Sequence, residues 1–152
     1  MGRSGAGVVK RFPDLPPVWA FGAAVLATIL AWLMPVARVP SWPGVLLLAC
    51  GLGLVFWSAW WFRHKRTTIV PGELPTALIV EGPYRVNRNP IYTGLVLIVL
   101  GYGLILGALS ALVPAFLLLW VIDRRFVRPE EAVLEASFGE SARHYFRSTR
   151  RW

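Results

Sequence analysis

Long apolar segments alternate with short polar ones along the chain, and this pattern predicts helices that cross a membrane. Uncharged apolar segments run over residues 18–34, 42–62 and 91–122. A helix needs roughly 20 residues to cross the hydrocarbon core at about 1.5 Å per residue, so each of the first two segments fits one span. The third segment is too long for a single span.

The middle of the third segment contains a candidate turn. Gly107 and Ser110 lie there, and residues of these types favour a tight connection between two short helices packed as a hairpin. We expect spans over about 91–106 and 110–122. One long tilted helix over 91–122 is the alternative, and it would place the polar segments that flank it on opposite faces of the membrane. The pattern therefore predicts an all-α integral membrane protein with about four transmembrane helices.

The positions of the basic residues test this count independently. Of the 16 Lys and Arg, three precede the first span, five lie between Arg63 and Arg88, and seven follow Ile122. Only Arg38 lies in the connection between the first two spans. Basic loops stay on the cytoplasmic side of a membrane. Four spans thus predict that both termini and the loop 63–90 are cytoplasmic, in an inner membrane of bacterial type.

Composition adds two exclusions. The net charge of +8 is compatible with binding to nucleic acid, but the charges flank apolar spans and 56 % of the residues are hydrophobic, so anionic lipid headgroups are the better match. We expect no nucleic-acid partner. The single cysteine, Cys50, lies inside a span, which leaves no internal disulfide or thiolate metal site, and we expect no bound metal.

The remaining segments complete the expected domain organisation. Residues 1–17 form a flexible tail rich in Gly, Pro and charge, and residues 18–152 form one membrane domain. The cytosolic loop 63–90 contains short extended pieces at 67–71 and 78–80. A short cytosolic helical cap follows over 123–152. Its first helix is expected to begin at Pro129 and to end at Gly139.

Two polar motifs flank the predicted hairpin. The first is Gly-Pro-Tyr-Arg at 82–85, followed by Arg88, Pro90, Tyr92 and Gly94. The second is the pair Glu130 and Glu131, followed by Leu134, Phe138 and Gly139, and beyond it come Tyr145 and the ending Arg151-Trp152. Over about residues 67–152 this pattern resembles the isoprenylcysteine carboxyl methyltransferase family, whose members are small integral-membrane enzymes related to the phospholipid N-methyltransferases.

Two positions depart from the family pattern. Asn89 stands where the eukaryotic enzymes have His, and Ala142 replaces the first of two tyrosines after the second motif. An Asn side chain keeps its hydrogen-bond donor and acceptor but cannot titrate, so a proton shuttle at this position is in doubt.

The resemblance implies S-adenosylmethionine as cofactor and a lipophilic or membrane-embedded methyl acceptor. An Arg can hold the cofactor's carboxylate, a Glu can accept from its ammonium or ribose, and aromatic faces can stabilise its sulfonium. We assign Arg88 and Glu131 to catalysis, with Arg88 orienting a carboxylate acceptor or Glu131 serving as the base for an amine acceptor. Residues expected to bind the cofactor are Asn89, Pro90, Tyr92, Gly94, Glu130, Glu131, Tyr145 and Arg151.

Other roles remain open for the same residues and for the chain. Arg85 and Arg88 can be interfacial residues whose charge reaches the headgroups, and the Glu pair can serve the helix dipole next to Arg124, Arg125 or Arg128. The leading function is methylation of a carboxylate similar to that of isoprenylcysteine. Its rivals are N-methylation of a phosphatidylethanolamine-type phospholipid and a non-catalytic membrane scaffold. The sequence predicts no oligomeric state.

Overall fold

The computed structural model describes residues 14–66 and 75–152, and these residues fold into helices without a β-strand. The long helices are α1 (Pro16–Leu33), α2 (Trp42–His64), α3 (Pro90–Ile105) and α4 (Val113–Ile122). Two shorter helices follow, α5 (Arg128–Phe138) and α6 (Glu140–Ser148). Three further helical turns connect them: η1 (Gly82–Arg85), η2 (Leu109–Leu112) and η3 (Asp123–Val127). The all-α prediction is confirmed for the described residues, whereas the expected tail over 1–13 and the extended piece at 67–71 lie outside them.

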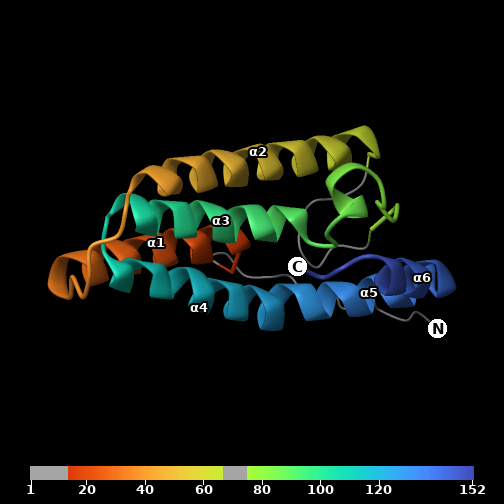
Figure 1. Cartoon of the computed structure of the whole chain (residues 1–152). Coiled ribbons are helices and arrows are strands. Elements are labelled where there is room, and N and C mark those ends of the chain that lie inside the picture. Colours follow the sequence, from red (N-terminus) through yellow and green to blue (C-terminus); the bar gives the residue numbers. More distant parts are fainter. Residues whose placement is uncertain (1–13, 67–74) are drawn as a thin grey trace.

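The long helices form a layered bundle in which α3 is central. Figure 1 shows α2 on one side of α3, with α1 and α4 on the other. Buried residues of α1, α3 and α4, among them Ala20, Val99, Leu118 and Ile122, form the main hydrophobic core. Because α2 packs mainly against α3, its other faces are left to the surroundings of the bundle.

Glycines determine how closely α2 and α3 approach. A Cβ atom built on Gly51 would lie 2.7 Å from the carbonyl oxygen of Gly94, and one on Gly44 would lie 2.5 Å from that of Gly101. The two pairs are seven residues apart on each helix, so both fall on the same face. Small residues at such contacts let helix backbones pack closely, as is common between membrane helices.

The expected hairpin is present at Gly107. Its φ of +74° lies in the left-handed region that favours glycine, and α3 ends two residues earlier at Ile105. After the turn, η2 leads into α4, which begins at Val113 and not at the expected residue 110. The connection between α1 and α2 pairs with this turn, since the N–H of Val39 donates to the carbonyl of Gly107 at 3.0 Å.

The first cap helix, expected to begin at Pro129, begins at Arg128 and continues directly from α4. The backbone stays helical through the π-helical segment η3, which joins α4 to α5. The N–H of Arg128 donates to the carbonyl of Asp123, five residues earlier. Pro129 has no N–H and would interrupt a regular α-helix, so the wider π turn accommodates it inside a continuous helix. Gly139, with φ of +53°, ends α5 as expected.

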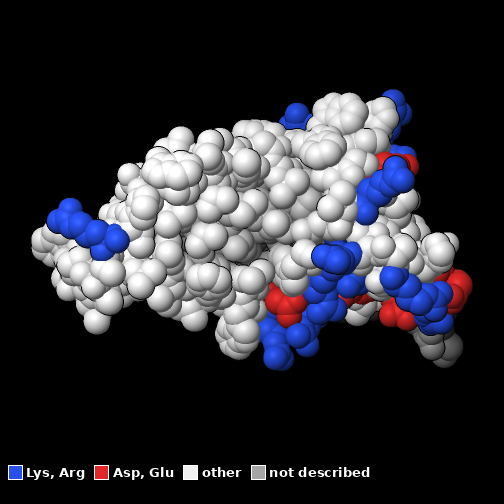
Figure 2. Space-filling model, viewed as in Figure 1, with Lys and Arg blue, Asp and Glu red and all other residues white. Residues whose placement is uncertain are grey.

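The outer surface of the bundle is apolar. Large side chains such as Phe21, Trp32, Phe56 and Trp120 are more than 60 % exposed. Figure 2 shows charged residues gathered mainly at the end of the bundle that carries α5 and α6, with a broad uncharged surface beside them. Such a surface fits lipid as the surrounding medium.

Two helices, α1 and α2, are long and apolar enough to cross a membrane. At 16 residues, α3 is shorter than the roughly 20 residues that a span usually needs. Membrane character is therefore supported by the structure, and the count of four spans remains a prediction.

Candidate active site

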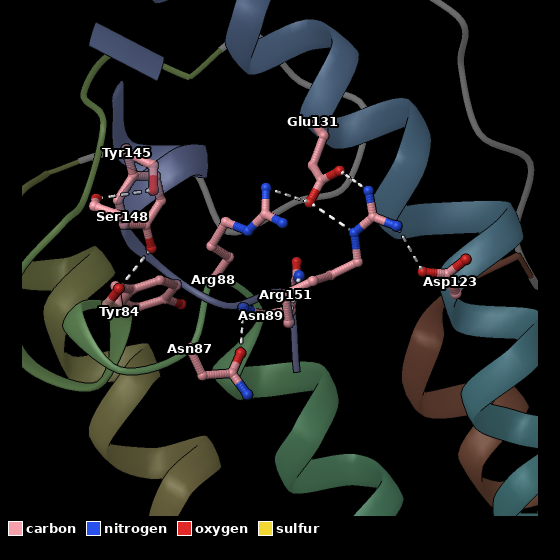
Figure 3. Close-up of polar contacts among 9 residues, drawn as sticks. All are labelled: Tyr84, Asn87, Arg88, Asn89, Asp123, Glu131, Tyr145, Ser148 and Arg151. Atoms are coloured by element: carbon pink, nitrogen blue, oxygen red, sulfur yellow. Dashed lines mark hydrogen bonds and ion pairs between the residues drawn. The ribbon is translucent and has the colours of Figure 1, made fainter. Parts of the chain in front are cut away.

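Segments from distant parts of the sequence meet at the charged end of the bundle. They are the loop before α3, the first turn of α3, the first turns of α5, helix α6 and the final residues 149–152. Figure 3 shows Arg88 and Arg151 pointing toward Glu131, with Tyr145 and Tyr84 in contact to one side.

Local hydrogen bonds fix the backbone of the loop before α3. The side-chain oxygen of Asn87 accepts from the N–H of Asn89 at 2.6 Å, and its amide group donates to the hydroxyl of Thr93 at 2.7 Å. This Asx-type turn directs the chain into α3, whose first position need not supply an N–H because Pro90 begins the helix. Gly82, at φ of +58°, starts η1 directly against the indole of Trp61.

The last residues of the chain pair with this loop. The N–H of Arg88 donates to the carbonyl of Arg150 at 2.9 Å, and the side chain of Asn89 donates to the carbonyl of Arg151 at 3.1 Å. The Asn89 side chain, which is almost completely buried, thus holds the C-terminal segment beside the loop. As a result, the side chain of Arg151 lies next to α5.

Glu131 lies between two arginines. Its carboxylate is 3.1 Å from an Nη atom of Arg88, and it accepts from both the Nε and an Nη atom of Arg151. Arg151 also lies 3.6 Å from Asp123, which in turn accepts from the Nε of Arg128 at 2.7 Å. From the sequence, Arg124, Arg125 and Arg128 are the candidate partners of the Glu pair. In the structure Glu131 pairs with Arg88 and Arg151 instead. Because α5 continues from α4, Glu131 has no free helix N-terminus to interact with.

Glu130 points to a different partner. The hydroxyl of Tyr92 donates to its carboxylate at 2.6 Å, which links the first turn of α3 to α5. The adjacent acidic residues therefore have separate tasks, since Glu131 binds guanidinium groups and Glu130 accepts from a phenol.

Tyr145 fixes α6 against η1. Its hydroxyl donates to the carbonyl of Tyr84 at 2.6 Å in a buried environment. Burial raises the pKa values of both Tyr84 and Tyr145 well above the ordinary tyrosine value, so both phenols stay protonated at physiological pH.

Arg88 has one group that the protein leaves unsatisfied. Its guanidinium lies 4.9 Å from the ring centre of Phe146 and contacts Glu131, and its side chain is largely buried. The Nε–H is buried but has no hydrogen-bond partner among the described residues 14–66 and 75–152. A buried donor of this kind costs free energy unless it is paired.

A cavity of about 430 Å³ adjoins these residues. This volume lies within the roughly 300–1,000 Å³ that is usual for small-molecule sites. Its polar lining consists of Tyr84, Arg88, Asn89, Tyr92, Glu130, Glu131 and Tyr145. Apolar residues from deeper in the bundle, such as Val55 of α2 and Leu95 of α3, line the remainder. The cavity thus joins a charged pocket to the apolar interior of the helix bundle.

The structure brings most of the residues expected from the sequence to this cavity. Arg88, Asn89, Pro90, Tyr92, Glu130, Glu131 and Tyr145 line it. Two others lie elsewhere. Gly94 packs against α2, where an added Cβ would meet Val55 and the backbone of Gly51, and Arg151 contacts Glu131 from outside the cavity lining.

Several lining residues were not expected from the sequence as members of the site. Tyr84 belongs to the first motif but was not assigned to the site, and Phe146, which stacks on Arg88, follows Tyr145 directly. The apolar lining, which includes Phe62, Leu78 and Leu134, had no distinguishing signal in a sequence this rich in apolar residues. Residues 15–17, expected as tail, also line the cavity, because α1 begins at Pro16.

Comparisons with known proteins identify the family of the chain. No curated protein and no solved structure matches the chain. The family described as phospholipid methyltransferase matches residues 39–141, which include α2, the loop before α3, the hairpin and α5. Since this match covers more than half of the chain, the protein belongs to the phospholipid methyltransferase family.

Proposed function

We propose that the protein is an S-adenosylmethionine-dependent methyltransferase that acts on a lipophilic acceptor at a membrane surface. The 430 Å³ cavity, whose lining includes Arg88, Glu130 and Glu131, carries the proposal, together with membership in a methyltransferase family. The narrower resemblance to isoprenylcysteine carboxyl methyltransferases remains part of the proposal, because the family match does not separate the two types of acceptor.

The residues of the cavity fit the groups of this cofactor. Arg88 lines the cavity, and its guanidinium can take a carboxylate. Glu130 and Glu131 offer acceptors for an ammonium or ribose hydroxyls, and Tyr84, Tyr145 and Phe146 offer aromatic faces near a positive charge. S-adenosylmethionine supplies a methyl group activated by its sulfonium.

The chain itself contributes alignment and exclusion of water. Methyl transfer requires the nucleophile, the methyl carbon and the sulfur in line, and such positioning is worth up to roughly 7–11 kcal/mol in favourable cases. The C-terminal segment and Tyr145 hold the loop and α6 against the mouth of the cavity. The apolar lining at Val55 and Leu95 gives a lipophilic acceptor a place within the bundle.

The roles of Arg88 and of the Glu pair differ between a carboxylate acceptor and an amine acceptor. For a carboxylate acceptor, Arg88 would supply orientation, as it was assigned from the sequence. For an amine acceptor, such as phosphatidylethanolamine, a carboxylate must receive a proton. Glu131 is the base assigned to this role from the sequence, and Glu130, which accepts from Tyr92 and lines the same cavity, is a second candidate.

Cofactor binding and product identity test the proposal separately. Titration calorimetry of detergent-purified protein should detect binding of S-adenosylmethionine, and absence of binding by folded protein would favour a membrane scaffold. Isotopically labelled cofactor should then transfer its methyl group in membrane extracts. Label in phospholipid would identify N-methylation, and base-labile label on a prenylated cysteine ester would identify carboxyl methylation.

Membrane orientation is a further part of the proposal. We place both termini and the loop 63–90 on the cytoplasmic side, in accord with the basic residues there. Cysteine residues introduced at Ser141 and near Arg38 should react with a membrane-impermeant thiol reagent from opposite sides of sealed vesicles. Labelling of both from one side would contradict four spans.

A further inference from the structure

A second cavity, of about 520 Å³, lies between α1 and α4. It shares no lining residue with the candidate active site. Its walls come from Val18, Gly22 and Leu26 of α1 and from Pro114, Leu118 and Val121 of α4. The cavity is therefore a groove between two neighbouring helices of the bundle.

The length of the groove matches one leaflet of a bilayer. On α1 it runs from residue 18 to residue 26 and on α4 from residue 114 to residue 121, with Arg125 beyond. At about 1.5 Å per residue these stretches span about 10–16 Å. Half of the roughly 30 Å hydrocarbon core is about 15 Å. Gly22 leaves space in the groove, since it has no side chain and a Cβ atom built on it would meet nothing within 4 Å.

A charged cluster closes one end of the groove. The Nε of Arg125 donates to the carboxylate of Asp14 at 2.7 Å, and the indole N–H of Trp19 donates to the same carboxylate at 3.1 Å. The guanidinium of Arg125 lies 5.6 Å from the centre of the Trp19 ring. Among the residues that the structure describes, the cluster thus combines a cation, an anion and an aromatic face at the end of an apolar groove.

We propose that this groove binds one zwitterionic phospholipid, with an acyl chain between α1 and α4 and its headgroup at Asp14, Trp19 and Arg125. A guanidinium carries five N–H donors, so Arg125 can bind the phosphate while it remains paired with Asp14. A carboxylate offers about four acceptor positions, so Asp14 can also bind the headgroup's cationic amine. The face of Trp19 adds to the attraction for that amine.

Charge distinguishes this lipid from the alternatives. An anionic lipid without an amine would bring a second negative charge close to Asp14, whereas the amine of a zwitterionic lipid would be attracted to that carboxylate. A detergent or a loosely held boundary lipid would use the apolar groove and ignore the cluster. Because none of the candidate catalytic residues lines the groove, the bound lipid is not the methyl acceptor of the proposed reaction.

Native mass spectrometry of the whole protein with defined lipids tests the proposal. The probes are phosphatidylethanolamine, phosphatidylcholine and phosphatidylglycerol with identical acyl chains. The wild type should retain the two zwitterionic lipids more strongly than phosphatidylglycerol. Gly22→Leu should fill the groove and weaken their retention, whereas Gly53→Leu, at an equally open position on α2, should leave it unchanged. Equal retention of all three lipids, or equal behaviour of the two variants, would overturn the proposal.

The headgroup contacts are tested by two charge variants. Arg125→Gln should weaken retention of both zwitterionic lipids by about threefold to fivefold, the range expected when an exposed charge contact of up to about 1 kcal/mol is lost. Asp14→Asn should weaken them similarly and strengthen phosphatidylglycerol, which reverses the ranking of headgroups. If Asp14→Asn retains the three lipids in the same order as the wild type, the cluster does not distinguish their headgroups. Thermal unfolding in detergent confirms that each variant is folded.

Discussion

Arg88 and Glu131 form a largely buried ion pair, 3.1 Å apart, that joins the loop before α3 to helix α5. The two residues are 43 positions apart in sequence and lie on either side of the hairpin. Both residues line the cavity, and their contact holds the guanidinium of Arg88 beside it. Glu131 therefore determines how Arg88 can meet a ligand, in addition to any contact of its own.

Replacing Glu131 should impair cofactor binding more than it impairs folding. In Glu131→Gln the two arginines lose their shared anion, so Arg88 is no longer held in place. Gln keeps a hydrogen-bond acceptor at this position but removes the charge that orients both guanidinium groups. We expect cofactor affinity in titration calorimetry to fall at least about tenfold, with expression intact.

Glu135 provides the matched control for this variant. It pairs with Arg143 on the exposed side of α5, outside the cavity lining, so Glu135→Gln removes an ion pair of the same type in a solvated setting. Exposed pairs contribute about 0–1 kcal/mol. Equal affinities of wild type and Glu131→Gln would remove Glu131 from the site.

A double-mutant cycle should show whether Arg151 binds the cofactor directly or positions Glu131. The sequence assigned Arg151 to cofactor binding, and the structure places its guanidinium on Glu131. If Arg151 acts through Glu131, Arg151→Gln should weaken cofactor binding in wild type and add little in Glu131→Gln. Coupled residues depart from additivity by about 0.5–3 kcal/mol. Additive losses would instead support direct contact.

The residues of the site could be predicted from the sequence better than the details of the helices around it. Polar residues such as Arg88, Asn89 and Glu130 stand out against an apolar background, and their placement beside one hairpin was enough to predict that they meet. The π segment over Asp123–Val127 could not be predicted, because it depends on how Pro129 is accommodated in a packed helix. The role of Gly94 depended on knowing that it faces Gly51.

The hydrogen-bond partners of the side chains could not be predicted from the sequence either. Hydropathy does not say that Asn89 binds the backbone of Arg151, or that Tyr145 donates to the carbonyl of Tyr84. Both contacts join the C-terminal residues to a loop about 60 residues earlier, and no local pattern records such a pairing. The apolar lining of the cavity was hidden for a related reason, since most residues in the spans are apolar.

Stability at alkaline pH should report the burial of Tyr145. Its pKa is raised by burial, so the folded protein keeps the phenol protonated when the unfolded chain begins to lose protons near pH 10. The stabilisation is complete below that pH and is lost as the pH rises towards the folded-state pKa. Thermal unfolding between pH 9 and 11 should show this decline, and Tyr145→Phe should show a shallower one.

Tyr102→Phe controls for the loss of a hydroxyl in general. Tyr102 shares a hydrogen bond with Thr28 at 2.9 Å, away from the candidate site. Both variants should lose about 0.5–1.5 kcal/mol of stability near neutral pH. Only Tyr145→Phe should also weaken cofactor binding, because only it frees α6 from η1. Identical binding by the two variants would separate α6 from the function of the site.

Glycine substitutions on α2 should reveal the close approach of α2 and α3. An alanine Cβ at Gly51 would lie 2.7 Å from the carbonyl of Gly94 and 2.9 Å from the backbone nitrogen of Ile98, so the helices must separate. Overpacking of this kind costs about 1–3 kcal/mol. At Gly53, on the same helix, the added methyl meets nothing within 4 Å, and alanine is the better helix former by about 1 kcal/mol. Unfolding in mixed detergent micelles should therefore show Gly51→Ala destabilised and Gly53→Ala unchanged or stabilised. Equal stability of the two variants would contradict the glycine contact between α2 and α3.

Gly51→Ala should also weaken cofactor binding, because Val55 lines the cavity one turn beyond Gly51.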